Sequence, residues 1–372
     1  MHFETKAVHA GMHIDDETGA VAPPLHLSTT FERSVAGDTP RGYSYIRDGN
    51  PTQAHLEEAL AILEGGEGAL AFASGMAAGV GLMHAMPRGA HAILPDDSYY
   101  SYRAVAAEFF ANWNMTFDVV GMEDLDAVRR AMRKETKLVW IESPSNPLMK
   151  VVDVAALTSL ARERSALSLV DNTFASPALQ QPLSLGADIS LQSTTKYLGG
   201  HSDVQGGALV FAKKNELFEH VEHARLLIGG VASPFNSWLV LRGIRSLAVR
   251  MRAHSDNALA IARFLTKNRR VEAVYYPGLE SHPRHSIAKR QMSAFGGMLS
   301  FLVKGGREDA LAVAAKVKLF TRATSLGGVE SLIEHRASSE GTASKTPQNL
   351  LRMSVGLEHA DDLIVDLAQA LE

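Results

Sequence analysis

The sequence predicts an α/β protein built on a mostly parallel sheet, and three adjoining stretches of alternating type indicate this class. Residues 137–142 (KLVWIE) are a short apolar run typical of a buried strand. Residues 153–165 have helical periodicity behind the N-cap candidate Asp153, and residues 166–171 (ALSLVD) are again typical of a strand. Because a strand, a helix and a strand in this order form a parallel βαβ unit, the sheet is expected to be largely buried. Two further strand candidates follow at residues 187–192 and 206–212.

The segment of residues 71–86 (AFASGMAAGVGLMHAM) predicts a strand, a turn at Ser74-Gly75 and an Ala-rich helix. The N–H groups that open such a helix can bind an anion, so this turn is a candidate phosphate site. The chain contains neither the GxxxxGK[ST] loop nor the GxGxxG turn of nucleotide-binding proteins. Residues 233–268 predict one long helical stretch, and we place a domain boundary near residue 235.

Composition limits the functional classes. The 372 residues are 46% hydrophobic and 21% charged, with a net charge of −4, so the chain is globular and carries no basic patch for nucleic acid or an anionic membrane. No apolar run approaches the roughly 20 residues that cross a bilayer, and we expect a soluble, cytoplasmic protein. Without cysteine there is no disulfide and no thiol nucleophile. The pairs His9/His13 and His282/His285 lack partners for a metal site, so no metal is expected.

Polar residues follow three of the predicted strands, at Glu142 to Asn146, at Asp171 and Asn172, and at Ser193 to Lys196. Ligands of open α/β sheets bind outside the carboxyl ends of the strands, so these groups are expected to meet in one crevice. A lysine, a carboxylate, small hydroxyl residues and a phosphate site together match the needs of pyridoxal 5'-phosphate (PLP). Taken singly, Asp171 could be a cap and Lys196 a surface lysine.

Nine motifs, in order and over nearly the whole chain, resemble the Cys/Met-metabolism family of PLP-dependent enzymes. They are YSYIRDGNPT, FASGMAA, DDSYY, WIESPSNPL, LVDNTFASP, STTKYLGGHSDVQGG, VYYPGL, SLGGVESLIEH and LLRMSVGLE. The family includes cystathionine γ-synthase, cystathionine γ-lyase, cystathionine β-lyase and methionine γ-lyase. The resemblance implies PLP as the cofactor and the PLP-dependent transferase fold of type I, similar to aspartate aminotransferase. It also implies three parts: an N-terminal arm (1–45) reaching a neighbouring subunit, a large PLP-binding domain (46–235) and a smaller C-terminal α/β domain (236–372).

The resemblance also implies the roles of the site residues. Lys196 would bind PLP covalently and then transfer protons, with assistance from Tyr99, and Asp171 would pair with the pyridine nitrogen. Tyr99 would stack on the cofactor ring, although DSYYSYR leaves open whether Tyr99 or Tyr100 does so. The complete cofactor set implied is Tyr45, Arg47, Gly75, Met76, Tyr99, Asp171, Ser193, Thr195 and Lys196.

Two implied contacts concern other molecules. Tyr45 and Arg47 would reach the cofactor phosphate of the neighbouring subunit, since an arginine suits a phosphate by its planar fork of donors. The expected assembly is therefore a homo-oligomer with shared active sites, a tetramer built as a dimer of dimers. The amino-acid substrate would be bound by Arg352 through its α-carboxylate, with Asn146, Ser325 and Thr324 alongside.

The sequence departs from the family pattern at the substrate channel. Thr324 stands where a glutamate is frequent, Arg336 stands where proline is common, and residues 337–347 (ASSEGTASKTP) replace a different run. The expected reaction is transsulfuration at Cγ of a sulfur amino acid or homoserine ester, with cystathionine γ-lyase placed ahead of cystathionine γ-synthase. Methionine γ-lyase and cystathionine β-lyase are further alternatives, and a catalytically weak PLP-binding scaffold is the non-enzyme alternative.

Overall fold

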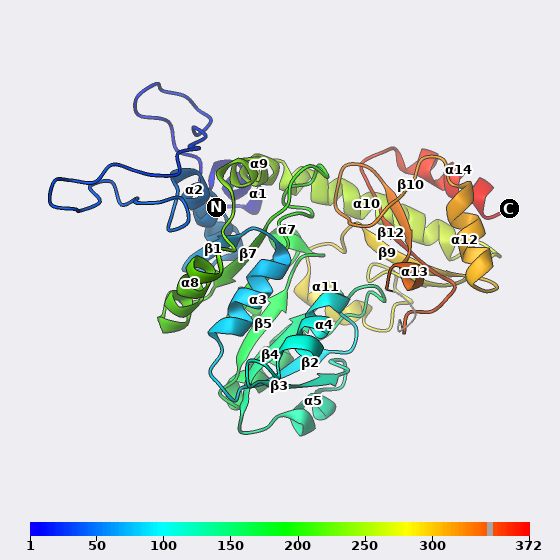
Figure 1. Cartoon of the computed structure of the whole chain (residues 1–372). Coiled ribbons are helices and arrows are strands. Elements are labelled where there is room, and N and C mark those ends of the chain that lie inside the picture. The colour runs from blue at the N-terminus through cyan, green and yellow to red at the C-terminus, as the bar shows by residue number, and fades with distance from the viewer. Residues whose placement is uncertain (341–344) are drawn as a thin grey trace.

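The chain folds around two sheets, one of seven and one of five strands, joined by long helices (Figure 1). The computed structural model describes residues 1–340 and 345–372, so part of the departing segment 337–347, namely residues 341–344, lies outside the described residues.

The seven-stranded sheet has the order β1-β7-β6-β5-β4-β2-β3. Its neighbours from β6 to β3 are parallel, whereas β7 is antiparallel to both β1 and β6, so the mostly parallel sheet is confirmed. The predicted strand and helix boundaries around the βαβ unit agree with the structure within a few residues. The strands are β1 (Gly68–Phe72), β2 (His91–Pro95), β3 (Thr116–Val120), β4 (Thr136–Glu142), β5 (Leu167–Asp171), β6 (Ile189–Gln192) and β7 (Gly207–Phe211).

Helices cover both faces of this sheet because alternate strand residues point to opposite sides. In β1, Leu70 and Phe72 face one core, and Ala69 and Ala71 face the other. The first face is covered by α3 (Gly75–Ala85), α4 (Tyr100–Phe109) and α8 (Glu216–Ile228). The second is covered by α2 (Pro51–Glu64), α5 (Leu125–Ala131), α6 (Val154–Glu163) and α9 (Pro234–Ile244), with the short α7 (Ser176–Leu179) and η1 (Pro182–Leu185) after β5.

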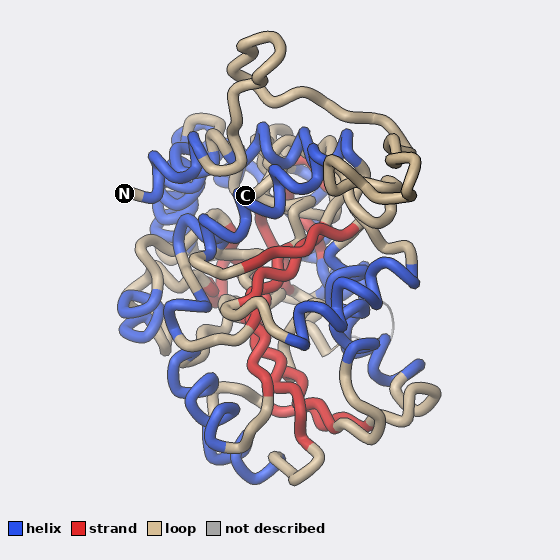
Figure 2. The backbone as a smooth tube through the Cα atoms, turned by 90° about the vertical axis from the view of Figure 1, so that its left-hand side faces the viewer, coloured by secondary structure: helices blue, strands red, loops and turns tan. Residues whose placement is uncertain are grey.

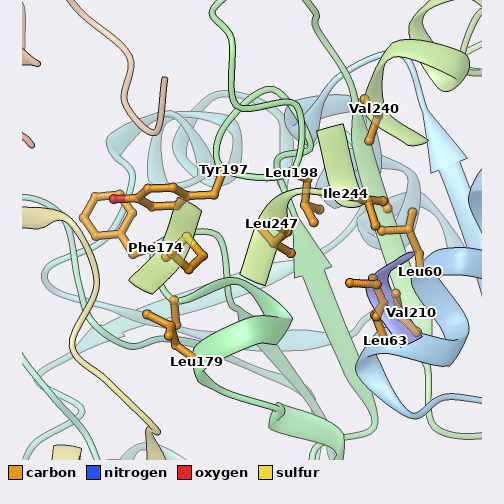
Figure 3. Packing of buried hydrophobic residues seen from close by; sticks show 14 of the residues in the cluster. Leu60, Leu63, Phe174, Leu179, Tyr197, Leu198, Val210, Val240, Ile244 and Leu247 are labelled. Carbon is orange, nitrogen blue, oxygen red and sulfur yellow. The ribbon is translucent and has the colours of Figure 1, made fainter. Parts of the chain in front are cut away.

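The packing between α2, β7 and α9 illustrates this second core. Leu60 and Leu63 of α2 lie against Val210 of β7, and Ile244 of α9 closes the cluster (Figure 3). All four side chains are buried. Fully burying a Leu, Val or Ile side chain contributes roughly 1.5–3 kcal/mol, so this cluster ties the helices firmly to the sheet.

The helical stretch predicted over residues 233–268 is wrong in one respect, because it is two helices. The chain breaks after α9, and α10 (Leu247–Leu265) starts in a new direction towards the second sheet (Figure 1). Arg250 explains the break: its guanidinium donates to Gly243 O at the end of α9 and to Tyr197 O, both at 2.7 Å. The terminal carbonyl is thus satisfied by a side chain, and the helix does not need to continue.

The five-stranded sheet has the order β10-β11-β12-β9-β8, antiparallel except for the pair β10 and β11. Its strands are β8 (Val271–Tyr275), β9 (Met298–Val303), β10 (Thr321–Arg322), β11 (Leu332–His335) and β12 (Leu350–Ser354). Its helices are α11 (His285–Gln291), α12 (Arg307–Lys316), α13 (Arg336–Glu340) and α14 (Ala360–Ala370). The core between the sheet and α10, α12 and α14 is separate from the cores of the large sheet.

The N-terminal segment has two parts. Helix α1 (Phe3–His9) packs against α2 and α10, whereas the chain between α1 and α2 projects from the body as long loops (Figures 1 and 2). These loops carry exposed apolar side chains. They are Ile14, Val21, Leu27 and Val35.

Candidate active site

A cavity of about 370 Å³ lies between the carboxyl ends of the large-sheet strands and the five-stranded sheet. It contains every site residue predicted from the sequence except Tyr45 and Arg47. We call its two sides the sheet wall and the C-terminal wall. The charged and aromatic groups of the sheet wall are Tyr99, Tyr100, Tyr102, Phe174, Glu142, Asp171 and Lys196. The C-terminal wall consists of Thr324, Ser325, Leu326, Arg336, Ser339 and Arg352.

Lys196 lies in the turn after β6, where its backbone N–H donates to Ser193 O at 3.1 Å. Its Nζ donates to Ser325 Oγ at 2.7 Å, so the amine reaches across the cavity to the C-terminal wall. Burial, and then the positive charge of Arg352, lower the pKa of Lys196 to about 8. An amine with this pKa is unprotonated much more often than an exposed lysine at neutral pH, which favours both nucleophilic attack and proton abstraction.

Two carboxyl groups end neighbouring strands of the sheet wall. Glu142 and Asp171 are paired in register between β4 and β5, and both are buried. Burial raises the pKa of Asp171 to about 6 although Thr173 donates to its carboxylate at 3.1 Å. Burial and the nearby charge of Asp171 raise the pKa of Glu142 well above its usual value. A cation in the cavity would favour the ionised form of Asp171. A protonated pyridine nitrogen supplies such a cation.

The start of α3 forms an anion cradle beside Ser193. Ser74 caps the helix by accepting the N–H of Ala77 at 3.0 Å, which leaves the first N–H groups, those of Gly75 and Met76, without intrahelical partners. A Cβ at Gly75 would lie 3.0 Å from Ser193 Cβ, so glycine allows the helix to approach Ser193. The Thr195 hydroxyl exchanges hydrogen bonds with Gly206, at 3.1 and 3.0 Å. The N–H groups of Gly75 and Met76 and the hydroxyl of Ser193 fit the phosphate of PLP, whereas the Thr195 hydroxyl donates to Gly206 O.

Tyrosines line the rim of the sheet wall. The backbone N–H of Tyr99 donates to Glu142 at 2.9 Å, which holds the residue at the cavity edge before α4. The Tyr100 ring contacts the Tyr99 ring edge to face, with 5.5 Å between the ring centres, and Tyr100 also lines the cavity. Which of the two tyrosines stacks on the cofactor ring therefore stays a prediction. Tyr102 is buried behind them and donates to Gly75 O at 2.7 Å. The phenol therefore supports the anion cradle from below.

Arg352 is the central residue of the C-terminal wall. It lies on β12 and is buried, with Nη1 donating to Asn146 Oδ1 at 2.9 Å and Nη2 to Ser325 O at 3.1 Å. Its Nη2 also contacts Glu334 Oε2 at 2.5 Å. Burial lowers the pKa of Arg352 to about 10, so the guanidinium stays charged at neutral pH. A buried, oriented guanidinium is suited to bidentate binding of a carboxylate.

Ser325 has a backbone conformation that residues other than glycine rarely adopt. Its φ is 82°, in the left-handed region, which costs of order 1–3 kcal/mol for a non-glycine residue. This conformation accompanies two contacts that link the walls: the hydroxyl accepts from Lys196, and the carbonyl accepts from Arg352. Ser325 therefore couples the position of the lysine to that of the arginine.

Tyr45 and Arg47 lie outside this cavity, on the projecting segment. Arg47 Nη1 donates to Leu226 O at 3.2 Å, and its guanidinium lies 5.6 Å from the centre of the Tyr45 ring. Both residues are exposed in the single chain. Their predicted contact with a cofactor in a neighbouring subunit remains a prediction.

Sequence reasoning did not select several residues that the fold brings to the cavity. Glu142 is one of the polar residues at the predicted strand ends, and its position next to Asp171 in a parallel pair is the signal that identifies it. Tyr102 follows the DDSYY motif by two residues and has helical spacing from Tyr99. The others are Thr173, Phe174, Gln205, Leu326 and Ser339, of which all but Ser339 lie within the nine motifs.

The described residues contain no group of three His, Asp or Glu side chains that could hold a metal ion. His282 and His285, expected on a loop, bind different carbonyl groups: His285, which opens α11, donates to Pro277 O at 2.8 Å, whereas His282 donates to Met149 O at 3.1 Å. In the described part of the chain, no helix has the length and apolar character for crossing a membrane.

The comparisons with known proteins agree on one family. A family model described as Cys/Met metabolism PLP-dependent enzyme matches residues 4–372. Over 99–100% of the chain and 96–99% of their own lengths, similar relatives are a cystathionine γ-synthase of Mycobacterium tuberculosis (48% identity), a cystathionine β-lyase of Lactococcus lactis (45%) and a cystathionine γ-lyase of Dictyostelium discoideum (44%). The crystal structure of metB from Corynebacterium glutamicum matches with a TM-score of 0.97 and 42% identity, covering 100% of this chain and 98% of that one.

Proposed function

Because the chain belongs to the Cys/Met-metabolism family of PLP-dependent enzymes, we propose that it acts at Cγ of a homoserine ester or a sulfur amino acid. Its cofactor is PLP, and its fold is the PLP-dependent transferase fold of type I that the sequence predicts. Our first candidate is γ-replacement on a homoserine ester, the reaction class of a cystathionine γ-synthase. Elimination, as in the cystathionine γ-lyase placed first from sequence, is the second candidate.

In this proposal each wall of the cavity has its own task. PLP, when bound, supplies an electron sink for negative charge on the substrate carbon next to the amino group. Gly75, Met76, Ser193 and Thr195 hold its phosphate, and Asp171 balances the charge of its ring nitrogen. Lys196 holds the cofactor covalently and, once released from it, moves protons at the substrate carbons.

The C-terminal wall orients the amino acid in this proposal. Arg352 binds the α-carboxylate, and Asn146 and Ser325 keep the guanidinium in place. The hydrogen bond from Lys196 to Ser325 holds the amine beside the wall that carries Arg352. With the two anchors set, the γ-substituent extends towards Thr324, Arg336 and Ser339.

The observation that favours a homoserine ester is the chemistry of this distal region. Among the described residues that line the C-terminal wall there is no carboxylate, and the side chain at position 324 is the neutral Thr324. Cystathionine carries a distal ammonium, which a carboxylate would bind by a charged hydrogen bond contributing about 1.5–3 kcal/mol. A homoserine ester has no such cation, so the lack of a carboxylate in the pocket does not weaken its binding.

The test is direct. The PLP-loaded protein is incubated with O-succinyl-L-homoserine plus L-cysteine, with L-cystathionine and with L-methionine, and the products are identified by mass. We expect cystathionine from the first mixture at a higher kcat/KM than breakdown of the other two. Faster breakdown of cystathionine would establish elimination as the main reaction, and no turnover of any of the three would contradict the proposed function.

We further propose that the active site is shared between chains, with residues 1–45 as an arm that covers a neighbouring subunit's large domain (46–235). The exposed apolar side chains of the projecting loops and the position of Tyr45 and Arg47 outside their own cavity support this arrangement. Lys196→Ala and Arg47→Ala should each be nearly inactive. Co-expressed in mixed oligomers, they should regain part of the activity, because some hybrid sites have both groups, and no recovery would contradict sharing.

A further inference from the structure

A second arginine, Arg336, lies on the C-terminal wall beside Arg352, and the two form one buried ion-pair network. Arg336 Nη1 donates to both oxygens of Glu334, at 3.2 and 3.3 Å, and Nη2 to Glu340 Oε1 at 3.0 Å. Arg352 Nη2 contacts the same Glu334 Oε2 at 2.5 Å. Because both guanidinium groups meet at one oxygen, an amino acid anchored at Arg352 has Arg336 within reach of its side chain.

The network presents its cations to the cavity and keeps its anions behind them. Arg336 and Arg352 line the cavity, whereas Glu334 and Glu340 are not among the lining residues. Ser339, which also lines the cavity, donates to Glu334 at 2.7 Å and so covers that carboxylate. A ligand that enters this region therefore meets positive charge and hydroxyl groups, which favour an anion over an ammonium.

Arg336 also has an unused donor. The side chain is only 5% exposed, and its Nε has no hydrogen-bond partner among the described residues. Leaving a buried N–H of a charged group unsatisfied costs free energy. The Nε itself is closed off from the cavity, so a ligand would be met by the part of the Arg336 side chain that lines it.

We propose that Arg336 is a specificity-determining residue that binds a distal carboxylate of the substrate, several bonds beyond Cγ. The inference rests on the proposed function and narrows it: the preferred substrate is a homoserine half-ester of a dicarboxylic acid, and a neutral acyl ester is a poorer substrate. Thr324 adds a hydroxyl group on the same side of the cavity, whereas the Ser339 hydroxyl donates to Glu334. Binding at both ends then orients the ester oxygen that leaves from Cγ.

The experiment compares two substrates that differ in the distal carboxylate, O-succinyl-L-homoserine and O-acetyl-L-homoserine, each with L-cysteine. The double variant Arg336→Gln/Glu340→Gln removes the cation together with one paired carboxylate, so no buried glutamate is left without its partner. We expect its kcat/KM for the succinyl ester to fall about 10- to 100-fold, while that for the acetyl ester is nearly unchanged. Arg336→Lys should retain part of the preference, because it keeps the charge.

Arg307→Gln is the matched control, since Arg307 is exposed and donates to Ser338 next to the same segment. It should leave both esters unaffected. An equal loss for both esters in the double variant would assign Arg336 a purely structural role and overturn the proposal. Unchanged kcat/KM values for both esters would overturn it as well. Turnover of neither ester by the unaltered protein would sink the proposed function instead, and spectral titration of the bound PLP with each ester then tests the carboxylate preference through its Kd.

Discussion

The two walls of the cavity differ in charge and in how they are built. The sheet wall carries both lining carboxylates, Glu142 and Asp171, together with Lys196, and its groups come from strand ends and one helix start. The C-terminal wall carries two arginines and hydroxyl groups, and its charges are balanced by glutamates that face away from the cavity.

From this difference we expect the sheet wall to serve the reaction chemistry and the C-terminal wall to select the substrate. Groups at the ends of parallel strands are held by the backbone register of the large sheet, so they suit a cofactor that is the same for every substrate. The C-terminal wall depends on side-chain ion pairs, in which one substitution changes the charge that a substrate meets. We therefore expect substitutions on the sheet wall to reduce turnover of every substrate, and substitutions on the C-terminal wall to change the ratio between substrates.

The largest effect is expected for Lys196→Ala on the sheet wall. Loss of the amine removes both the covalent attachment and the proton transfer, and turnover of every substrate should fall at least about 10³-fold. Borohydride reduction followed by peptide mapping should find the cofactor on Lys196 in the unaltered protein and on no lysine in the variant. Lys213→Ala, at an exposed residue paired with Glu67, is the control. A reduced cofactor on another lysine would refute the assignment.

Asp171→Asn should be the next most damaging substitution. The amide keeps the size but not the charge that balances the ring nitrogen, and we expect turnover to fall about 10²-fold, of order 3 kcal/mol in the barrier. The loss should be the same for homoserine esters and for cystathionine, as measured by steady-state kinetics. Asp126→Asn on the exposed surface serves as control. Near-normal activity would exclude Asp171 from the site.

Glu64, at the end of α2, should make the free energy of unfolding depend on pH. It is buried, and it accepts hydrogen bonds from Asn172, Ser190 and Gln192. Burial raises the pKa of Glu64 to about 7, so the folded state holds this proton more tightly than the unfolded state, whose carboxyl has a pKa near 4.5. The free energy of unfolding should therefore fall by about 3 kcal/mol as pH rises from about 4.5 to 7.

Urea unfolding at pH 5 and pH 8 measures this dependence. In Glu64→Gln the fall between the two pH values should shrink by the contribution of this group, because the amide oxygen still accepts the same donors and does not titrate. Asp126→Asn should leave the pH dependence unchanged. An equal fall in the Glu64→Gln variant would show that other groups cause it.

The smallest effect is expected at Thr324 on the C-terminal wall. Thr324→Glu adds an anion that can bind the distal ammonium of cystathionine, and kcat/KM for cystathionine relative to methionine should rise about 10-fold. Thr324→Gln, of the same size without the charge, should not produce this rise. A ratio that stays level or falls would mean that residue 324 does not contact the distal group, leaving Arg336 as the main determinant.

The sequence alone predicted five of the seven strands of the large sheet, but not β2 and β3, and it named many of the residues that line the cavity. Strand and helix periodicity located the βαβ unit and its N-cap Asp153, which accepts the Ala156 N–H at 3.1 Å. Ordered motifs identified Lys196, Asp171 and Arg352, all of which line the cavity. These signals are local: each depends on the chemistry of a few consecutive residues, which survives without knowledge of the rest of the chain.

Only the tertiary structure decided which distant residues meet. At the break between α9 and α10, Arg250 donates to Gly243 O and to Tyr197 O, and the pairing of Glu142 with Asp171 depends on the register of β4 and β5. The network of Arg336, Glu334 and Arg352 likewise joins α13, β11 and β12. Side-chain direction at such points is set by packing between elements, and no periodicity within one segment contains it. The charge that lines the cavity is therefore a property of the fold, whereas the residues that we propose to supply the chemistry could be named from the sequence.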